Sequence, residues 1–89
     1  GMHGFTISLA QENAKFGITV NTVSPGYIGT DMVMAVPEDV RAKIVAQIPL
    51  GRLGEPDEIA YAVSFFLAEE AAWITGANLA INGGHYMGW

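Results

Sequence analysis

The sequence predicts an α/β fold in the order helix, strand, helix, helix, strand. Three observations support this prediction: apolar side chains recur at helical spacing near the start of the chain, a β-branched run stops at Pro25-Gly26, and a second short apolar run stops at Asn82. Strands that are separated by helices normally run parallel and are joined by a right-handed crossover. We therefore expect two neighbouring parallel strands with helices between them.

The first two elements follow from local signals. Residues 1–15 show an amphipathic helical pattern, and Gly17 is a typical residue just beyond the end of a helix. Residues 18–24 are rich in β-branched side chains, which favour a buried strand. Pro25 has no N–H group to donate to a neighbouring strand, and Gly26 allows a sharp turn, so we expect the strand to end here.

Two further helices and a second strand follow. Residues 26–36 carry mixed signals and are expected to form a loop, after which Pro37 opens a helix that Pro49 ends. Pro56 opens the next helix, and residues 79–81 form the last strand. One apolar stripe of the last helix is expected to face the core, and it consists of Ile59, Val63, Phe66 and Leu67.

The composition indicates part of a larger structure. Apolar residues make up 51% of the 89 residues, and charged residues only 15%. A chain of this length buries only about 60% of the surface that its unfolded form exposes. Two parallel strands would also leave unpaired edges, and a parallel sheet normally has both faces covered. We therefore expect the chain to belong to a larger cooperative fold, or to hide apolar surface in partners.

The charges and the lack of cysteine argue against several functions. The net charge is −5 and the four cationic side chains are dispersed, whereas nucleic-acid binding needs a basic patch. The sequence has no cysteine, and His85 has no partner at metal-ligand spacing. No apolar run is long enough to span a bilayer. We expect no metal, no nucleic-acid partner, no membrane partner and a cytoplasmic location.

Three segments in the same order resemble parts of the classical short-chain dehydrogenase/reductase family. Residues 21–26 are similar to the family's sixth strand and its Pro-Gly turn, and residues 52–60 to the loop that leads into its last long helix. Residues 74–84 are similar to its seventh strand and tail. The resemblance covers essentially the whole chain. It implies that residues 1–89 are the C-terminal portion of a single doubly wound, parallel Rossmann sheet.

Within the family, the segment after Pro25 and the tail after Gly83 are most similar to reductases of acetoacetyl-CoA. The resemblance implies an NADPH-dependent reductase of 3-ketoacyl thioesters that converts acetoacetyl-CoA to 3-hydroxybutyryl-CoA, in a homo-oligomer that we expect to be a tetramer. The cofactor is expected to be NADP(H), and NAD stays open because the residue that selects between them has no counterpart here. The alternatives are a 3-oxoacyl-ACP or other small-ketone reductase, and a non-catalytic chain that assembles through apolar surface.

The resemblance also assigns site residues just after the first strand. It implies that Pro25, Gly26, Ile28 and Thr30 contact the cofactor, and that Tyr27 contacts the acyl thioester substrate. Each assignment has a structural alternative. The Pro-Gly pair can simply end a strand, the threonine can cap a helix, and the tyrosine can be ordinary packing.

The catalytic groups of the family have no counterpart in the chain. The Gly-rich phosphate loop, the catalytic Ser and the Tyr-x-x-x-Lys pair are absent from the sequence. In the family, that Lys lies just upstream of the position that Gly1 matches. We therefore expect the chain to hold no catalytic residue and to be inactive alone. It would supply a nicotinamide wall, part of the acyl pocket and interface surface.

Overall fold

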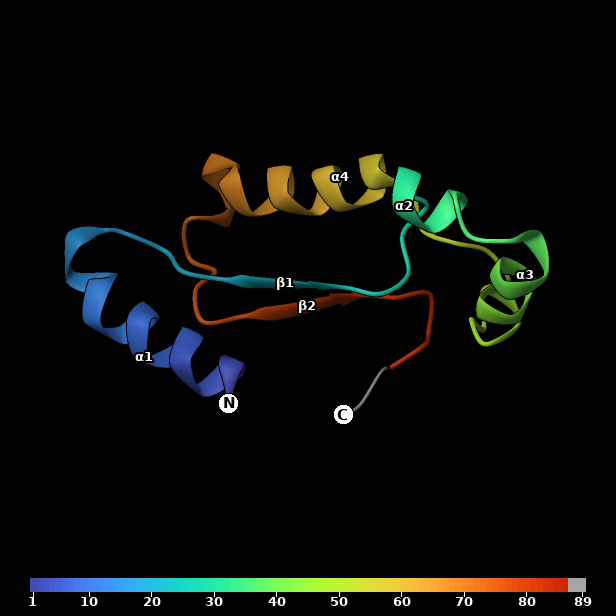
Figure 1. The fold of residues 1–89 in the computed structure, drawn as a ribbon. Helices are drawn as coiled ribbons and strands as arrows, with labels where there is room; N and C mark the ends of the chain where they lie inside the picture. The colour runs from blue at the N-terminus through green and yellow to red at the C-terminus, as the bar shows by residue number, and fades with distance from the viewer. Residues whose placement is uncertain (87–89) are drawn as a thin grey trace.

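The structure is a computed structural model that describes residues 1–86 (Figure 1). Its elements follow the predicted order, with an additional short helix and short 3₁₀ turns. In chain order they are α1 (Met2–Asn13), η1 (Ala14–Phe16), β1 (Thr22–Pro25), α2 (Asp31–Met34), α3 (Glu38–Ala46), α4 (Pro56–Leu67), η2 (Glu69–Ala71) and β2 (Asn78–Ile81).

The strands β1 and β2 form the parallel pair that the sequence predicts. Thr22 pairs with Asn78 at the start of the ladder, and Pro25 pairs with Ile81 at its end, where β1 stops as expected. The Gly26 N–H continues the ladder by donating to the Ile81 carbonyl oxygen over 2.9 Å. Both strands therefore end at the same edge, which is the edge where open α/β sheets bind ligands.

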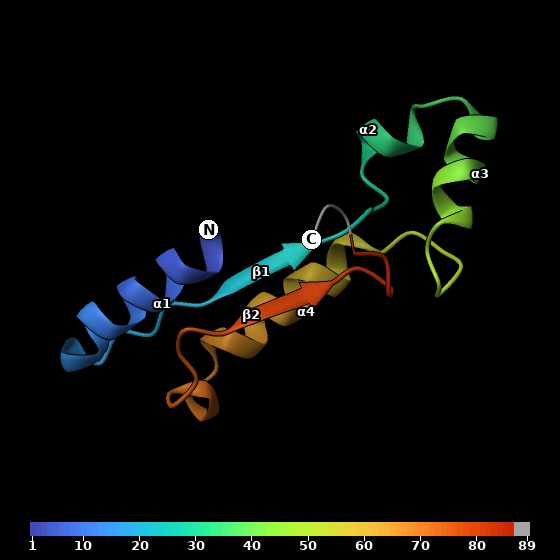
Figure 2. The ribbon, with the colours of Figure 1, turned by 90° about the horizontal axis from the view of Figure 1, so that it is seen from below.

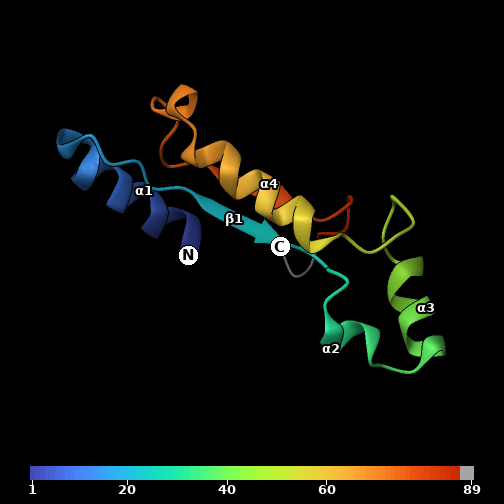
Figure 3. The same ribbon diagram turned by 90° about the horizontal axis from the view of Figure 1, so that it is seen from above.

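The helices are arranged unevenly around the strands (Figures 1 and 2). The helix α4 lies along one face of the two strands, and α1 lies on the opposite side. The helices α2 and α3 project beyond the ends of the strands, as Figure 3 shows from above. The fold is elongated, with extents of 51 × 26 × 21 Å. No helix within residues 1–86 combines the length and the apolar character needed to cross a membrane.

The start of β1 differs from the prediction, because the strand begins at Thr22 and not at residue 18. The residue before it, Asn21, is bound through its side chain. Its amide donates to the Ile74 carbonyl oxygen over 3.1 Å and accepts from the Ala77 N–H over 3.0 Å. The Gly76 N–H also donates to the Val20 carbonyl oxygen over 2.8 Å, but the regular pairing of β1 begins at Thr22, where β2 runs beside it.

Most helix boundaries follow the predicted signals. Gly17 adopts the left-handed conformation (φ 73°) after η1, and its N–H donates to the Ala14 carbonyl oxygen over 3.0 Å. Pro56 is the first residue of α4, as predicted. In contrast, α3 ends at Ala46, before Pro49, because the following N–H groups bond three residues back and tighten the chain.

The segment after β1, which is predicted to be a loop, contains the short helix α2. Thr30 caps this helix, because its Oγ1 accepts a hydrogen bond from the Val33 N–H over 3.4 Å. Asp31 adds an acidic side chain to the first turn, where it favours the positive end of the helix. A helix of 4 residues is too short to show a periodic apolar pattern, so only its cap could have indicated it.

The core is small, and much apolar surface is exposed. The prediction that the α4 stripe faces the core is wrong for Leu67, which is 80% exposed, and is met only in part by Val63, at 43%. Two strands are too narrow to cover the whole apolar side of this helix. The buried apolar residues of the described chain are Ala10, Ile48, Ala62 and Ala71.

We expect the 89-residue chain to associate at micromolar concentration. Trp73 is almost fully exposed and Leu67 largely so, and exposed apolar surface of this kind drives assembly. Sedimentation velocity should show an oligomer or an aggregate. A monomeric boundary together with cooperative unfolding would contradict this prediction.

Candidate functional site

The end of β1 is packed tightly against the end of β2. A Cβ atom on Gly26 would lie 2.8 Å from Asn82 Cβ and 2.9 Å from Asn82 Cα, closer than real Cβ atoms approach. Gly26 does not have a positive φ, so its requirement for glycine is steric. The segments that follow β1 and β2 therefore leave the sheet in direct contact with each other.

The chain beyond Gly26 is held by a short parallel bridge to the loop before α4. The Gly54 N–H donates to the Tyr27 carbonyl oxygen over 3.0 Å, and the Gly29 N–H donates to the Gly54 carbonyl oxygen over 2.8 Å. The bridge leaves the Ile28 N–H without a hydrogen bond to any other residue of 1–86. This segment therefore presents a backbone donor whose two neighbours are both fixed.

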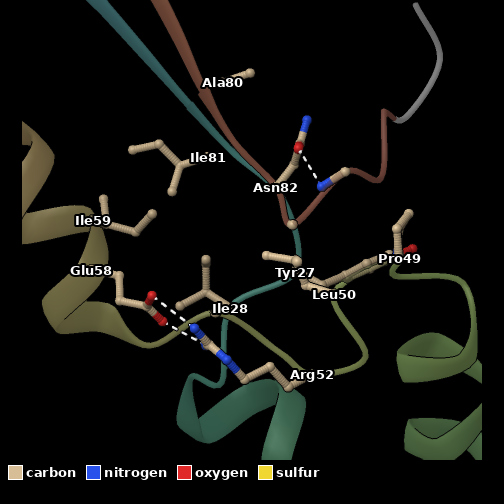
Figure 4. A pocket seen from close by; sticks show the side chains of 13 residues that line it. Tyr27, Ile28, Pro49, Leu50, Arg52, Glu58, Ile59, Ala80, Ile81 and Asn82 are labelled. Atoms are coloured by element: carbon tan, nitrogen blue, oxygen red, sulfur yellow. Dashed lines mark hydrogen bonds and ion pairs between the residues drawn. The ribbon is translucent and has the colours of Figure 1, made fainter.

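A cavity of about 500 Å³ opens beside this bridge (Figure 4). Tyr27 and Ile28 line it from the end of β1, and Asn82 lines it from the end of β2. Within the described part of the chain, no group of His, Cys, Asp or Glu side chains is placed to hold a metal ion. The cavity wall also includes residues of the loop before α4 and of the first turn of α4, namely Leu50, Arg52, Gly54, Glu58 and Ile59.

The structure brings only part of the predicted site to the cavity wall. Tyr27 and Ile28 line the cavity, whereas Pro25, Gly26 and Thr30 do not. Gly26 instead permits the close approach of the two strand ends. The structural alternative for Thr30 is confirmed, since it caps α2. Its hydroxyl accepts one bond there and keeps its own hydrogen available, so capping is compatible with a ligand contact.

An ion pair on the cavity wall joins Arg52 and Glu58, which the sequence indicates only through the family resemblance of residues 52–60. The guanidinium donates to both carboxylate oxygens, over 2.7 and 3.0 Å (Figure 4). The carboxylate also accepts from the Glu55 N–H over 2.9 Å. The hydrogen bond from Arg52, followed by that from the Glu55 backbone, lowers the pKa of Glu58 to about 2. The pair fastens the start of α4 to the loop that lines the cavity.

Protonation of Glu58 should break this pair only in strong acid. The folded-state pKa of Glu58 is lowered from 4.5 to about 2, so its contribution to stability is present above pH 4.5 and is lost as the pH falls toward 2. A ¹³C NMR titration of the Glu58 carboxyl carbon should show a midpoint near 2, and Arg52→Leu should move it back toward 4.5. The same midpoint in both proteins would mean that Arg52 is not the cause.

Asn82, Gly83 and Gly84 form a backbone turn directly after β2. Gly83 and Gly84 have φ angles of 61° and 94°, a left-handed conformation that glycine adopts without strain. Asn82 Oδ1 accepts from the Gly84 N–H over 2.9 Å. The Leu50 N–H donates to the Gly83 carbonyl oxygen over 3.0 Å, which ties the loop before α4 to the end of β2.

Parallel strands that end together beside a cavity define an α/β protein with a candidate site at the carboxyl edge of its sheet. Residues 1–86 match the family model described as enoyl-(acyl carrier protein) reductase, and the chain belongs to this family of short-chain dehydrogenases/reductases. The family predicted from the three sequence segments is therefore confirmed.

Individual relatives cover almost the whole chain. It is 54% identical over 98% of its length to an acetoacetyl-CoA reductase of Allochromatium vinosum, and 58% identical over 99% to an acetoacetyl-CoA reductase of Cupriavidus necator. It is also 58% identical over 98% of its length to the 3-oxoacyl-(acyl-carrier-protein) reductase FabG of Escherichia coli. The chain spans 35 to 36% of the length of these three relatives.

Proposed function

We propose that residues 1–89 are the C-terminal portion of a single Rossmann-fold domain in an NADPH-dependent reductase of 3-ketoacyl thioesters. The proposed reaction converts acetoacetyl-CoA to 3-hydroxybutyryl-CoA. The names of the relatives support it, because they are acetoacetyl-CoA reductases and a 3-oxoacyl-(acyl-carrier-protein) reductase. The cavity at the carboxyl edge of parallel strands supports it independently.

The observation that carries the proposal is the N–H of Ile28, which has no hydrogen bond to another residue of 1–86. The residues on both sides of it are fixed by the bridge to the loop before α4, so this donor is already in place before a ligand binds. A nicotinamide carboxamide is a planar group that rigid backbone donors can orient. We infer that the Ile28 N–H donates to the carboxamide oxygen. Pro25 and Gly26 form the wall beside the ring, and the Thr30 hydroxyl donates to the cofactor.

Tyr27 is the proposed substrate contact. Its side chain lines the cavity, and its hydroxyl has no hydrogen bond to another residue of 1–86. A phenol can donate to a thioester carbonyl oxygen. When bound, the reduced nicotinamide supplies the hydride that the ketone carbon receives, while a group outside this chain gives the ketone oxygen its proton. The role of this chain is to hold the cofactor and the acyl group in reacting geometry.

A second candidate substrate is the same ketoacyl group carried by acyl carrier protein. It is favoured by the 58% identity to the Escherichia coli FabG, which equals the identity to the Cupriavidus necator reductase. We propose CoA as the preferred carrier, NADPH as the preferred cofactor, and a cytoplasmic homotetramer as the working form. Values of kcat/KM for acetoacetyl-CoA and acetoacetyl-ACP, each with NADPH and NADH, test the first two choices.

In the full-length reductase, Tyr27→Phe and Thr30→Ala should affect different ligands. Tyr27→Phe should raise KM for acetoacetyl-CoA several-fold, because it removes a neutral hydrogen bond worth about 1 kcal/mol. The KM of the Tyr27→Phe variant for NADPH should stay unchanged. Thr30→Ala should raise KM for NADPH more than KM for the thioester. Steady-state kinetics of both variants with both ligands measures the two patterns.

Each variant serves as the control for the other. Thr30 also caps α2, so melting temperatures must show that Thr30→Ala leaves the protein folded at the assay temperature. Equal effects of Tyr27→Phe on both ligands, or no effect on either, would identify Tyr27 as ordinary packing.

A further inference from the structure

Tyr27 forms a stacked pair with His85, although the two residues are far apart in the sequence. Their ring centroids lie 5.7 Å apart, and the ring planes are inclined by only 11°. This is an offset-stacked arrangement, which is among the favourable geometries for two aromatic rings. From the sequence alone no role is expected for His85, because it has no partner at metal-ligand spacing.

The turn after β2 holds His85 over Tyr27. The left-handed conformations of Gly83 and Gly84 reverse the chain, and the His85 N–H donates to the Asn82 carbonyl oxygen over 3.1 Å. Asn82 in turn packs against Gly26, the residue before Tyr27. The two members of the stack are therefore anchored on the two strand ends that contact each other.

The imidazole contributes its face to this contact. His85 Nε2 is buried and has no hydrogen-bond partner among residues 1–86. A buried nitrogen without a partner adds no favourable hydrogen bond, so the stacked ring accounts for the interaction. The stack restrains the Tyr27 ring while its hydroxyl has no bond to another residue of this part of the chain. The stack therefore holds the Tyr27 ring in place, while the Tyr27 hydroxyl is placed to bind a ligand.

We propose that His85 is a positioning residue for the substrate. It holds the Tyr27 ring against the cavity wall, so that the hydroxyl meets the carbonyl oxygen of a 3-ketoacyl thioester without a loss of ring freedom on binding. This role rests on the proposed function of the same site. It makes the turn after β2 part of the substrate specificity of the enzyme.

The test compares His85→Ala with His85→Phe in the full-length reductase. His85→Ala removes the stack and should raise KM for acetoacetyl-CoA roughly two- to tenfold, with kcat and KM for NADPH nearly unchanged. His85→Phe keeps a stacking ring and removes the unpaired nitrogen, so it should restore the original KM. In a Tyr27→Phe background, His85→Ala should add little, because its effect acts through the Tyr27 hydroxyl.

A spectroscopic measurement separates this proposal from the proposed function. In protein with ¹³C-labelled tyrosine rings, stacking should shift the Tyr27 ring-proton resonances, which Tyr27→Phe identifies by removing them. The shift should persist in His85→Phe and disappear in His85→Ala. A missing shift, or an unchanged KM in His85→Ala, overturns the positioning role. A normal shift in an unaltered protein that does not reduce acetoacetyl-CoA overturns the proposed function, and the substrate role with it.

Discussion

The isolated 89-residue chain is expected to show no NADPH-dependent reduction of acetoacetyl-CoA. The sequence has no Gly-rich phosphate loop to hold the cofactor and no Tyr-x-x-x-Lys pair to supply the proton. Catalysis by a positioned acid contributes about 10²- to 10⁴-fold in rate. Loss of the groups that bind the cofactor lowers the rate further. Consumption of NADPH by the purified chain, followed by its absorbance, should therefore equal the rate without protein.

The activity assay of the isolated chain needs two control samples. The proposed full-length reductase, assayed at the same molar concentration, shows the activity expected when the phosphate loop and the catalytic groups are present. A mock preparation from cells without the gene shows what host reductases contribute. Turnover by the chain above the mock preparation would overturn the assignment of its catalytic groups to a part of the protein outside residues 1–89.

Gly26→Ala in the proposed full-length reductase is expected to damage both the fold and the proposed cofactor site. The new methyl group would lie 2.8 Å from Asn82 Cβ and 2.9 Å from Asn82 Cα, and the Cα belongs to a backbone that cannot rotate away. Overpacking of this kind lowers the free energy of unfolding by about 1 to 3 kcal/mol. The shift of the two strand ends should also displace the Ile28 N–H. We expect NADPH affinity to fall at least several-fold, as measured by calorimetric titration, with stability measured by urea unfolding.

Gly29→Ala is the matched control, because it adds the same methyl group in the same segment. The nearest atom to a Cβ on Gly29 is the Gly54 carbonyl oxygen at 3.6 Å, an ordinary contact, and Gly29 has no positive φ. This variant should change the free energy of unfolding by less than about 1 kcal/mol. If both variants lose similar amounts of stability and NADPH affinity, the segment tolerates no added side chain at either position. The Gly26–Asn82 contact would then not be the cause.

The exposed apolar surface bears on the alternative of a non-catalytic assembling chain. Trp73 and Leu67 are largely exposed, because the sheet within residues 1–86 has only two strands to cover the helices. In the proposed reductase, the rest of the sheet and neighbouring subunits would cover such surface. Association of the isolated chain is therefore expected under both functions, and the activity comparison with the full-length protein is what separates them.

Local signals in the sequence determined the order of the main elements, although not the short helix α2 or the start of β1. Gly17 ends the first helical segment, Pro25 ends β1, and Pro56 opens α4, as predicted. These positions are set by the backbone preferences of a few adjacent residues, which the sequence displays directly. The family could be recognised for the same reason, because its three characteristic segments are each contiguous in the chain.

The tertiary structure alone decided which residues meet at the site. Three features join segments that are distant in sequence: the Gly26–Asn82 contact, the stack of Tyr27 on His85, and the bridge beside Ile28. Within residues 1–86, that bridge leaves the Ile28 N–H without a hydrogen bond. These contacts depend on the register of β1 against β2 and on where the loop before α4 crosses the strand ends. Register is a property of two segments together, so the preferences of either one alone do not encode it.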